Sequence, residues 1–107
     1  MSDEQTGTVA HFYIEKPSER VDPIWVYVHD CAPGQGMVTV CCYGTAWTAY
    51  WGSMGNKTVR EFLARCDPDY LCKNLASNDR KSTKGEYVYR IKVATSVLNH
   101  LKDPANV

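Results

Sequence analysis

The chain has 107 residues and no net charge, because 12 lysines and arginines balance 12 aspartates and glutamates. This length predicts a single domain, and the 44% of hydrophobic and 22% of charged residues exclude wholesale disorder, collagen and coiled coil. The neutral balance argues against a general DNA-coating protein, which would be basic, and against an acidic DNA mimic.

The first residues of the chain and its cysteines indicate the compartment and the cofactors to expect. The first residues are polar and acidic, unlike a secretory signal, and no apolar run reaches the ~18 residues of a membrane span. We therefore expect a cytoplasmic protein with a disordered lead (1–6), one domain (7–103) and a tail (104–107). The five cysteines cannot all pair within one chain, and their spacing matches no usual zinc site. Reduced thiols, no metal and no cofactor are expected.

The first half of the chain reads as β-structure. Strand-forming residues occupy 8–15, 24–29, 37–43 and 45–51, with a turn at 32–36. In the second segment, aliphatic side chains from Ile24 onward take one face, and Trp25, Tyr27 and His29 take the other. Gly44 marks a bulge or bend, after which the chain either continues the third strand or begins a fourth.

The second half has helical periodicity. Residues 58–61 and 83–86 form capping boxes, and Asp67 with Pro68 is typical of a further helix start. The last helix runs to about residue 103, although 86–93 also alternates as a strand would. Its predicted apolar stripe is Tyr87, Ile91, Ala94, Leu98 and Leu101.

This element order predicts an α+β fold. We expect an antiparallel sheet of three to four strands, followed by two short helices and one longer C-terminal helix. With helices on one face only, the other face of the sheet meets water.

The charges divide unevenly along the chain. Residues 1–55 carry two basic and six acidic groups, whereas residues 56–107 carry ten basic and six acidic groups. One interpretation is a basic face that steers an acidic partner, protein or nucleic acid; the other is a set of solvated side chains. Lys81, Lys84 and Arg90 belong to this basic group.

The segment 41–55 has no charged residue but contains Trp47, Tyr50, Trp51 and Met54. In a strand, Trp47 and Trp51 lie on one side and Tyr50 on the other. We expect these rings to be mostly core, with one or two exposed. Exposed rings and Met would anchor a protein partner or stack on unpaired bases.

A catalytic signature is not found, so we do not expect an enzyme. The alternative that stays open is a thiol nucleophile, Cys31 or Cys42, with His11 or His29 as its base. No spacing implies a third group that would orient the histidine.

Three short motifs point to a family. W-G-x-M-G at 51–55, T-x-x-E-F at 58–62 and D-x-D-Y-L at 67–71 resemble small, uncharacterised accessory proteins of tailed phages and prophages. The resemblance covers residues 42–71, about a third of the chain. It implies a phage origin and action in the host cytoplasm, and it transfers no catalytic residue.

From these features we expect a non-enzymatic phage-encoded protein that docks on a host protein complex. Inhibition or modulation of a host-defence complex, as by anti-CRISPR proteins, is the expected role by analogy. The alternative is a nucleic-acid-binding accessory protein that uses the C-terminal basic patch and exposed aromatics. Monomer and homodimer both stay open. The expected partner-binding residues are Trp47, Tyr50, Trp51, Met54, Lys81, Lys84 and Arg90.

Overall fold

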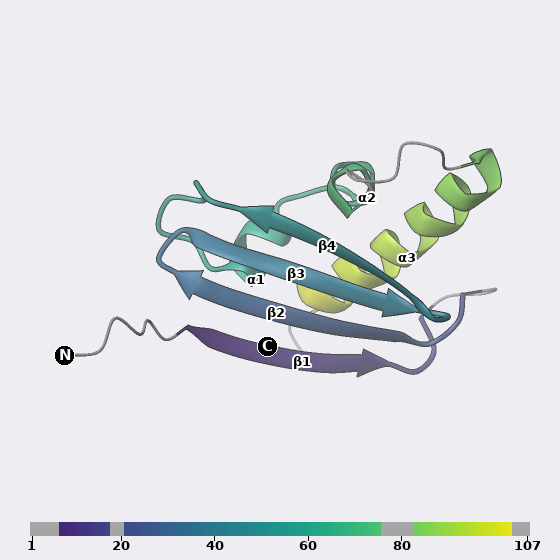
Figure 1. The fold of residues 1–107 in the computed structure, drawn as a ribbon, viewed down its shortest axis with the longest axis horizontal. Helices are drawn as coiled ribbons and strands as arrows, with labels where there is room; N and C mark the ends of the chain where they lie inside the picture. Colours follow the sequence, from purple (N-terminus) through teal and green to yellow (C-terminus); the bar gives the residue numbers. More distant parts are fainter. Residues whose placement is uncertain (1–6, 18–20, 76–82, 104–107) are drawn as a thin grey trace.

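The computed structural model describes residues 7–17, 21–75 and 83–103, and the predicted lead and tail lie outside them. The strands form one four-stranded sheet. This sheet is the front layer in Figure 1, and α1 and α3 pass behind it. Neighbouring strands pair antiparallel in the order of the sequence. The predicted α+β class is confirmed. The elements are β1 (Thr8–Ile14), β2 (Ile24–Ala32), β3 (Gln35–Cys42), β4 (Thr45–Trp51), α1 (Val59–Leu63), α2 (Pro68–Leu75) and α3 (Lys84–Lys102).

A tight hairpin turn settles the question of a fourth strand. Tyr43 and Gly44 link β3 to β4 with backbone φ angles of 50° and 76°. Two consecutive residues with positive φ form the turn type whose twist suits antiparallel strands. Gly44 is therefore part of a turn between two strands and not a bend within one, and β4 begins at Thr45.

Side chains alternate in the same phase on all paired strands. Val26 lies opposite Phe12 and Val40, and Val40 lies opposite Trp47, all on the side facing the helices. A single core forms between this face and the helix layer. Its fully buried members include Ile24, Val26, Val38, Val40, Val59, Leu63, Leu71, Val93, Val97 and Leu98.

The start of α1 is anchored on the sheet. Thr58 and Glu61 form the predicted capping box, in which each side chain accepts the other residue's backbone N–H, at 3.2 Å and 3.0 Å. The Asp30 carboxylate on β2 accepts a further N–H, that of Val59, at 2.8 Å. Beneath this turn lies Gly36, where a Cβ would be 2.3 Å from Val59 Cγ2. The close approach of α1 thus requires glycine on β3.

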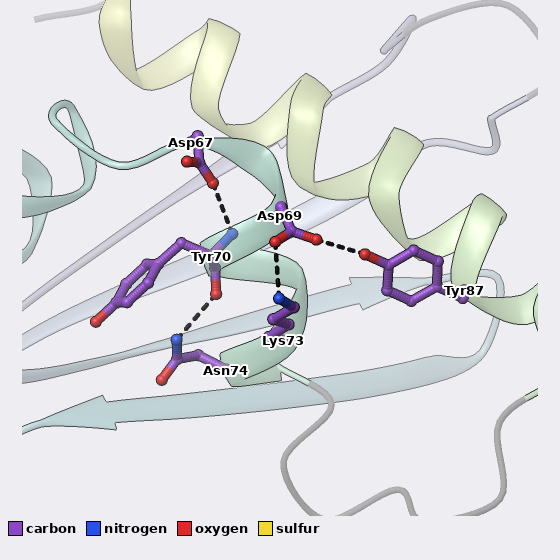
Figure 2. Close-up of polar contacts among 6 residues, drawn as sticks. All are labelled: Asp67, Asp69, Tyr70, Lys73, Asn74 and Tyr87. Carbon is purple, nitrogen blue, oxygen red and sulfur yellow. Dashed lines mark hydrogen bonds and ion pairs between the residues drawn. The ribbon is translucent and has the colours of Figure 1, made fainter.

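Polar contacts join α2 to α3, as Figure 2 shows. Asp67 accepts the backbone N–H of Tyr70 at 2.8 Å and caps α2 as predicted. Asp69 pairs with Lys73 at 3.0 Å and accepts a 2.5 Å hydrogen bond from the Tyr87 hydroxyl. The Tyr87–Asp69 bond ties the first turn of α3 to α2.

The last helix has a wider buried face than the predicted stripe. Residues 86–93 are helical, so the strand alternative is wrong there. Ala94, Leu98 and Leu101 are buried as expected, but Val93 and Val97 are also fully buried. Tyr87 and Ile91 are only partly buried. The helix packs against both α2 and the sheet, so its contact face is broader than one stripe.

The two turn glycines provide a matched stability test. Gly34 and Gly44 have φ angles of 75° and 76°, but a Cβ on Gly34 would lie 2.1 Å from the Gly55 carbonyl oxygen, whereas Gly44 has open space. Gly44→Ala should cost about 1 kcal/mol, the conformational penalty alone. Gly34→Ala should cost at least about 2 kcal/mol more because backbone must move. Urea denaturation measures both, and equal costs would contradict the close approach.

A second test concerns the link between α2 and α3. The hydrogen bond from Tyr87, and then Lys73, holds the pKa of Asp69 below its ordinary value. A carboxyl group whose pKa is lowered by folding stabilises the protein above its unfolded pKa, and this contribution is lost as the pH falls through the folded pKa. Tyr87→Phe should therefore raise the pKa of Asp69 and reduce this acid-dependent loss. Carboxyl ¹³C NMR titration measures the pKa, with Tyr50→Phe as a control that should leave it unchanged.

Candidate protein-binding surface

One face of the sheet is turned away from the helices. We call the twelve paired residues whose side chains lie there the open face. Their types include tyrosine, tryptophan, histidine, methionine and threonine, and none is Asp, Glu, Lys or Arg. They form three rows across the strands: Tyr13, Trp25, Cys41 and Ala46; His11, Tyr27, Thr39 and Thr48; Val9, His29, Met37 and Tyr50.

The large rings of the open face are accessible to solvent. Tyr13, Trp25, Tyr27 and Tyr50 have exposed fractions of 42%, 46%, 40% and 52%. Tyr and Trp are the residue types that most often anchor protein interfaces, and charged residues are depleted at interface centres. This composition is typical of a contact surface.

Cross-strand contacts organise these side chains. The rings of Tyr13 and Trp25 lie 4.3 Å apart, and those of His11 and Tyr27 lie 6.1 Å apart, measured between centroids. The hydroxyls of Thr39 and Thr48 share a 3.2 Å hydrogen bond. A partner would meet side chains already ordered on rigid strands, which lowers the entropy cost of binding.

The rings of Trp47, Tyr50 and Trp51 are mostly buried with one exposed, as expected, but two of the four nominated anchors are core residues, which corrects their assignment to a partner-binding surface. Trp51 is 8% exposed and Met54 is 4% exposed, Trp47 is partly buried against the core, and only Tyr50 lies on the open face. For Trp47 and Trp51 the reason is strand parity, since the odd-numbered residues of β4 face the helices, whereas Met54 is buried in the segment after β4. The indole N–H of Trp51 donates to the Tyr70 hydroxyl at 2.9 Å.

The W-G-x-M-G motif is explained by folding. The backbone N–H of Met54 donates to the Gly34 carbonyl at 2.8 Å, which ties the segment after β4 to the β2–β3 turn. Gly55 adopts a positive φ of 70°. Of the charge-free segment 41–55, residues 45–51 form β4 and only residues 52–55 lie in the connection from β4 to α1.

Of the predicted steering charges, the two in the described part of the chain, Lys84 and Arg90, do not lie beside these rings. Arg90 is only 3% exposed because it lies on the buried face of α3 with Ala94 and Val97. Its assignment as a steering charge on the surface is therefore wrong. Lys84 is exposed at the first turn of α3, on the helix side of the sheet. Lys81 lies outside the described residues.

Several open-face residues were not nominated from the sequence. Tyr13, Trp25, Tyr27, His11 and Met37 lie there, although Trp25 and Tyr27 had been assigned to one face of their strand. The missing signal was register. Pairing the non-aliphatic positions of all four strands would have collected these residues into one surface.

A cavity of about 480 Å³ lies between the β3–β4 turn and the start of α3. In it the Tyr89 hydroxyl donates to the Asp22 carboxylate at 2.7 Å and lies 3.4 Å from Cys42 Sγ. Burial raises the pKa of the Cys42 thiol and of the Tyr89 hydroxyl. Both groups therefore keep their protons at neutral pH, unlike an activated nucleophile.

In the thiol–histidine alternative, the geometry speaks against the pairings that use Cys42. Cys42 faces the helices, whereas His11 and His29 belong to the open face, so the sheet separates them. Cys31 Sγ approaches the backbone oxygen of His29 at 3.9 Å. Among residues 7–17, 21–75 and 83–103, no three His, Cys, Asp or Glu side chains form a group that could hold a metal ion.

Comparisons with known proteins give the family. A family model described as a phage family matches residues 2–96, so the chain belongs to this phage protein family. Neither the curated proteins nor the solved structures include a match. In the part of the chain that the structure describes, no helix is long and apolar enough to cross a membrane.

Neighbouring residues of β4 test the division between core and open face. Trp51→Ala should cost about 3–5 kcal/mol of folding free energy, because it empties a core position and removes the bond to Tyr70. Tyr50→Ala should cost less than about 1 kcal/mol because its ring lies in solvent. Chemical denaturation measures both, and similar costs would show that β4 is not placed with Trp51 inward.

Proposed function

We propose that this phage-family protein is a non-enzymatic binding protein that docks through its open face on a host protein complex in the host cytoplasm. Binding inhibits or modulates the complex, and a CRISPR-type defence complex is the first target to test. The observation that carries the proposal is the set of four exposed rings on a sheet face without a charged residue. Phage-family membership supports a host-cell target.

The dimensions of the open face limit how it binds. With strands about 4.8 Å apart and about 3.4 Å per residue, four strands of seven residues present roughly 19 by 24 Å. This is smaller than the ~800 Å² that each partner buries in a standard interface. We infer that a few central rings supply most of the affinity, as in other small hot-spot interfaces. Trp25 and Tyr27, on the inner strand β2, are the main anchors.

Nucleic-acid binding is the second candidate, and one observation favours it. A four-stranded sheet with exposed rings is also the platform on which some RNA-binding domains stack bases. Such binding draws much of its affinity from cations that neutralise phosphates, and the open face has no lysine or arginine. A protein partner fits this face better.

Alanine substitutions on and off the open face test the proposal. The tagged protein should capture a stoichiometric complex from host lysate, and titration with the purified complex should show at least tenfold weaker binding for Trp25→Ala. Tyr43→Ala is the matched control, because Tyr43 is 81% exposed on the β3–β4 turn away from the open face. In a host with an active CRISPR system, the wild type and Tyr43→Ala should restore phage plaques, and Trp25→Ala should not.

Two results would count against the proposal. Equal affinity of Trp25→Ala and wild type would remove the open face as the docking site. A mobility shift of RNA or DNA probes that weakens with salt and needs Trp25 would favour the nucleic-acid candidate instead.

A further inference from the structure

The outer edge of β1 lacks the usual protection of an edge strand. Its seven residues, Thr8–Ile14, contain no charged residue and no proline. The pairing with β2 runs without interruption from Thr8 to Ile14, so no bulge twists this edge away. Natural proteins normally block such edges with lysine, proline or bulges, because unpaired backbone groups recruit another strand.

The helix layer covers only part of β1, where His100 of α3 stacks on Phe12 with ring centroids 4.4 Å apart. Ala10 points toward the helix side of the sheet and is nevertheless exposed, and Val9 on the open face is 61% exposed. Only Phe12 and Ile14 of this strand pack against the core. The other edge differs, because α2 packs against β4 and buries Trp51. Among the described residues, the outer edge of β1 is therefore less covered than that of β4.

We propose that β1 pairs antiparallel with β1 of a second copy of the chain, about a twofold axis at His11, to form one continuous sheet. This inference goes beyond the proposed function and does not depend on it. In such a dimer the two open faces lie side by side and stay exposed.

The register follows from two requirements. Directly opposed residues in an antiparallel pair point to the same side, so the helix side and the open face stay separate only if even-numbered residues meet even-numbered ones. Among registers of this parity, pairing Thr8 with Ile14 overlaps all seven residues. His11 then lies opposite its own copy.

In this register small side chains lie opposite large ones, which favours a second copy of the chain as the strand that pairs with β1. On the helix side, the small, exposed Ala10 lies opposite the large Phe12 of the other copy. On the open face, Val9 lies opposite Tyr13, a β-branched and aromatic pair of the kind that stabilises sheets. No charge is left unpaired across the strand. A twofold contact also closes on itself and does not extend into a fibre.

Sedimentation equilibrium over a range of concentrations tests this dimer. A single strand edge buries less than a standard interface, so we expect a dissociation constant on the order of 10 µM. His11→Lys places two ammonium groups opposite each other and should raise this constant at least about tenfold. Thr48→Lys is the matched control, because Thr48 ends the same cross-sheet row on β4. It should leave the constant unchanged.

A second variant keeps the test decisive if His11→Lys does not fold, which circular dichroism will show. Under mild oxidation, His11→Cys should form an intermolecular disulfide in a larger fraction of molecules than wild type or Thr48→Cys. A wild-type protein that stays monomeric up to about 0.5 mM would overturn the proposal, because a dimer with the expected dissociation constant forms well below that concentration. A dimer broken by Thr48→Lys, or oligomers that keep growing, would also overturn it.

Discussion

The whole structure depends on one shared phase of alternation across four antiparallel strands. Tight hairpins keep β2, β3 and β4 in step, and continuous pairing aligns β1 with β2, so aliphatic side chains such as Val26 and Val40 meet on one side. The helices cover that side and seal the core. The other side then carries the exposed rings of Tyr13, Trp25, Tyr27 and Tyr50. A slip of one residue in any strand would exchange the two sets, which is why register controls both stability and the surface.

The helix layer is held in place by contacts that the sheet itself provides. Gly36 allows α1 to approach, and Asp30 accepts a hydrogen bond from the first turn of that helix. Trp51 reaches from β4 to Tyr70 on α2. The contact of Trp51 with Tyr70 gives the W-G-x-M-G segment a role in holding the helices on the sheet. A distinctive motif can thus report how a family folds while its binding surface lies elsewhere.

The open face and the β1 edge share one property, the absence of charged side chains where a protein usually places them. On the face, exposed rings are supported by their neighbours across the strands, as in the Tyr13–Trp25 contact. At the edge, Ala10 and Val9 stay exposed beyond the reach of the helices. Dimerisation through the edge would double the area of the face without covering it, so the two proposed interactions are compatible.

Local chemistry was sufficient to predict the elements. The capping residues Thr58, Asp67 and Thr83 act within one turn of their own helices, so the sequence alone determined where those helices begin. Alternation along each strand likewise determined the α+β class and the separation of Trp51 from Tyr50. Tertiary structure alone decided which of those two faces the helices cover, because that choice depends on contacts between residues far apart in the chain. It also decided that Arg90 is buried and that Trp25 and Tyr27 join the exposed surface, since register and helix packing are set only when the whole sheet assembles.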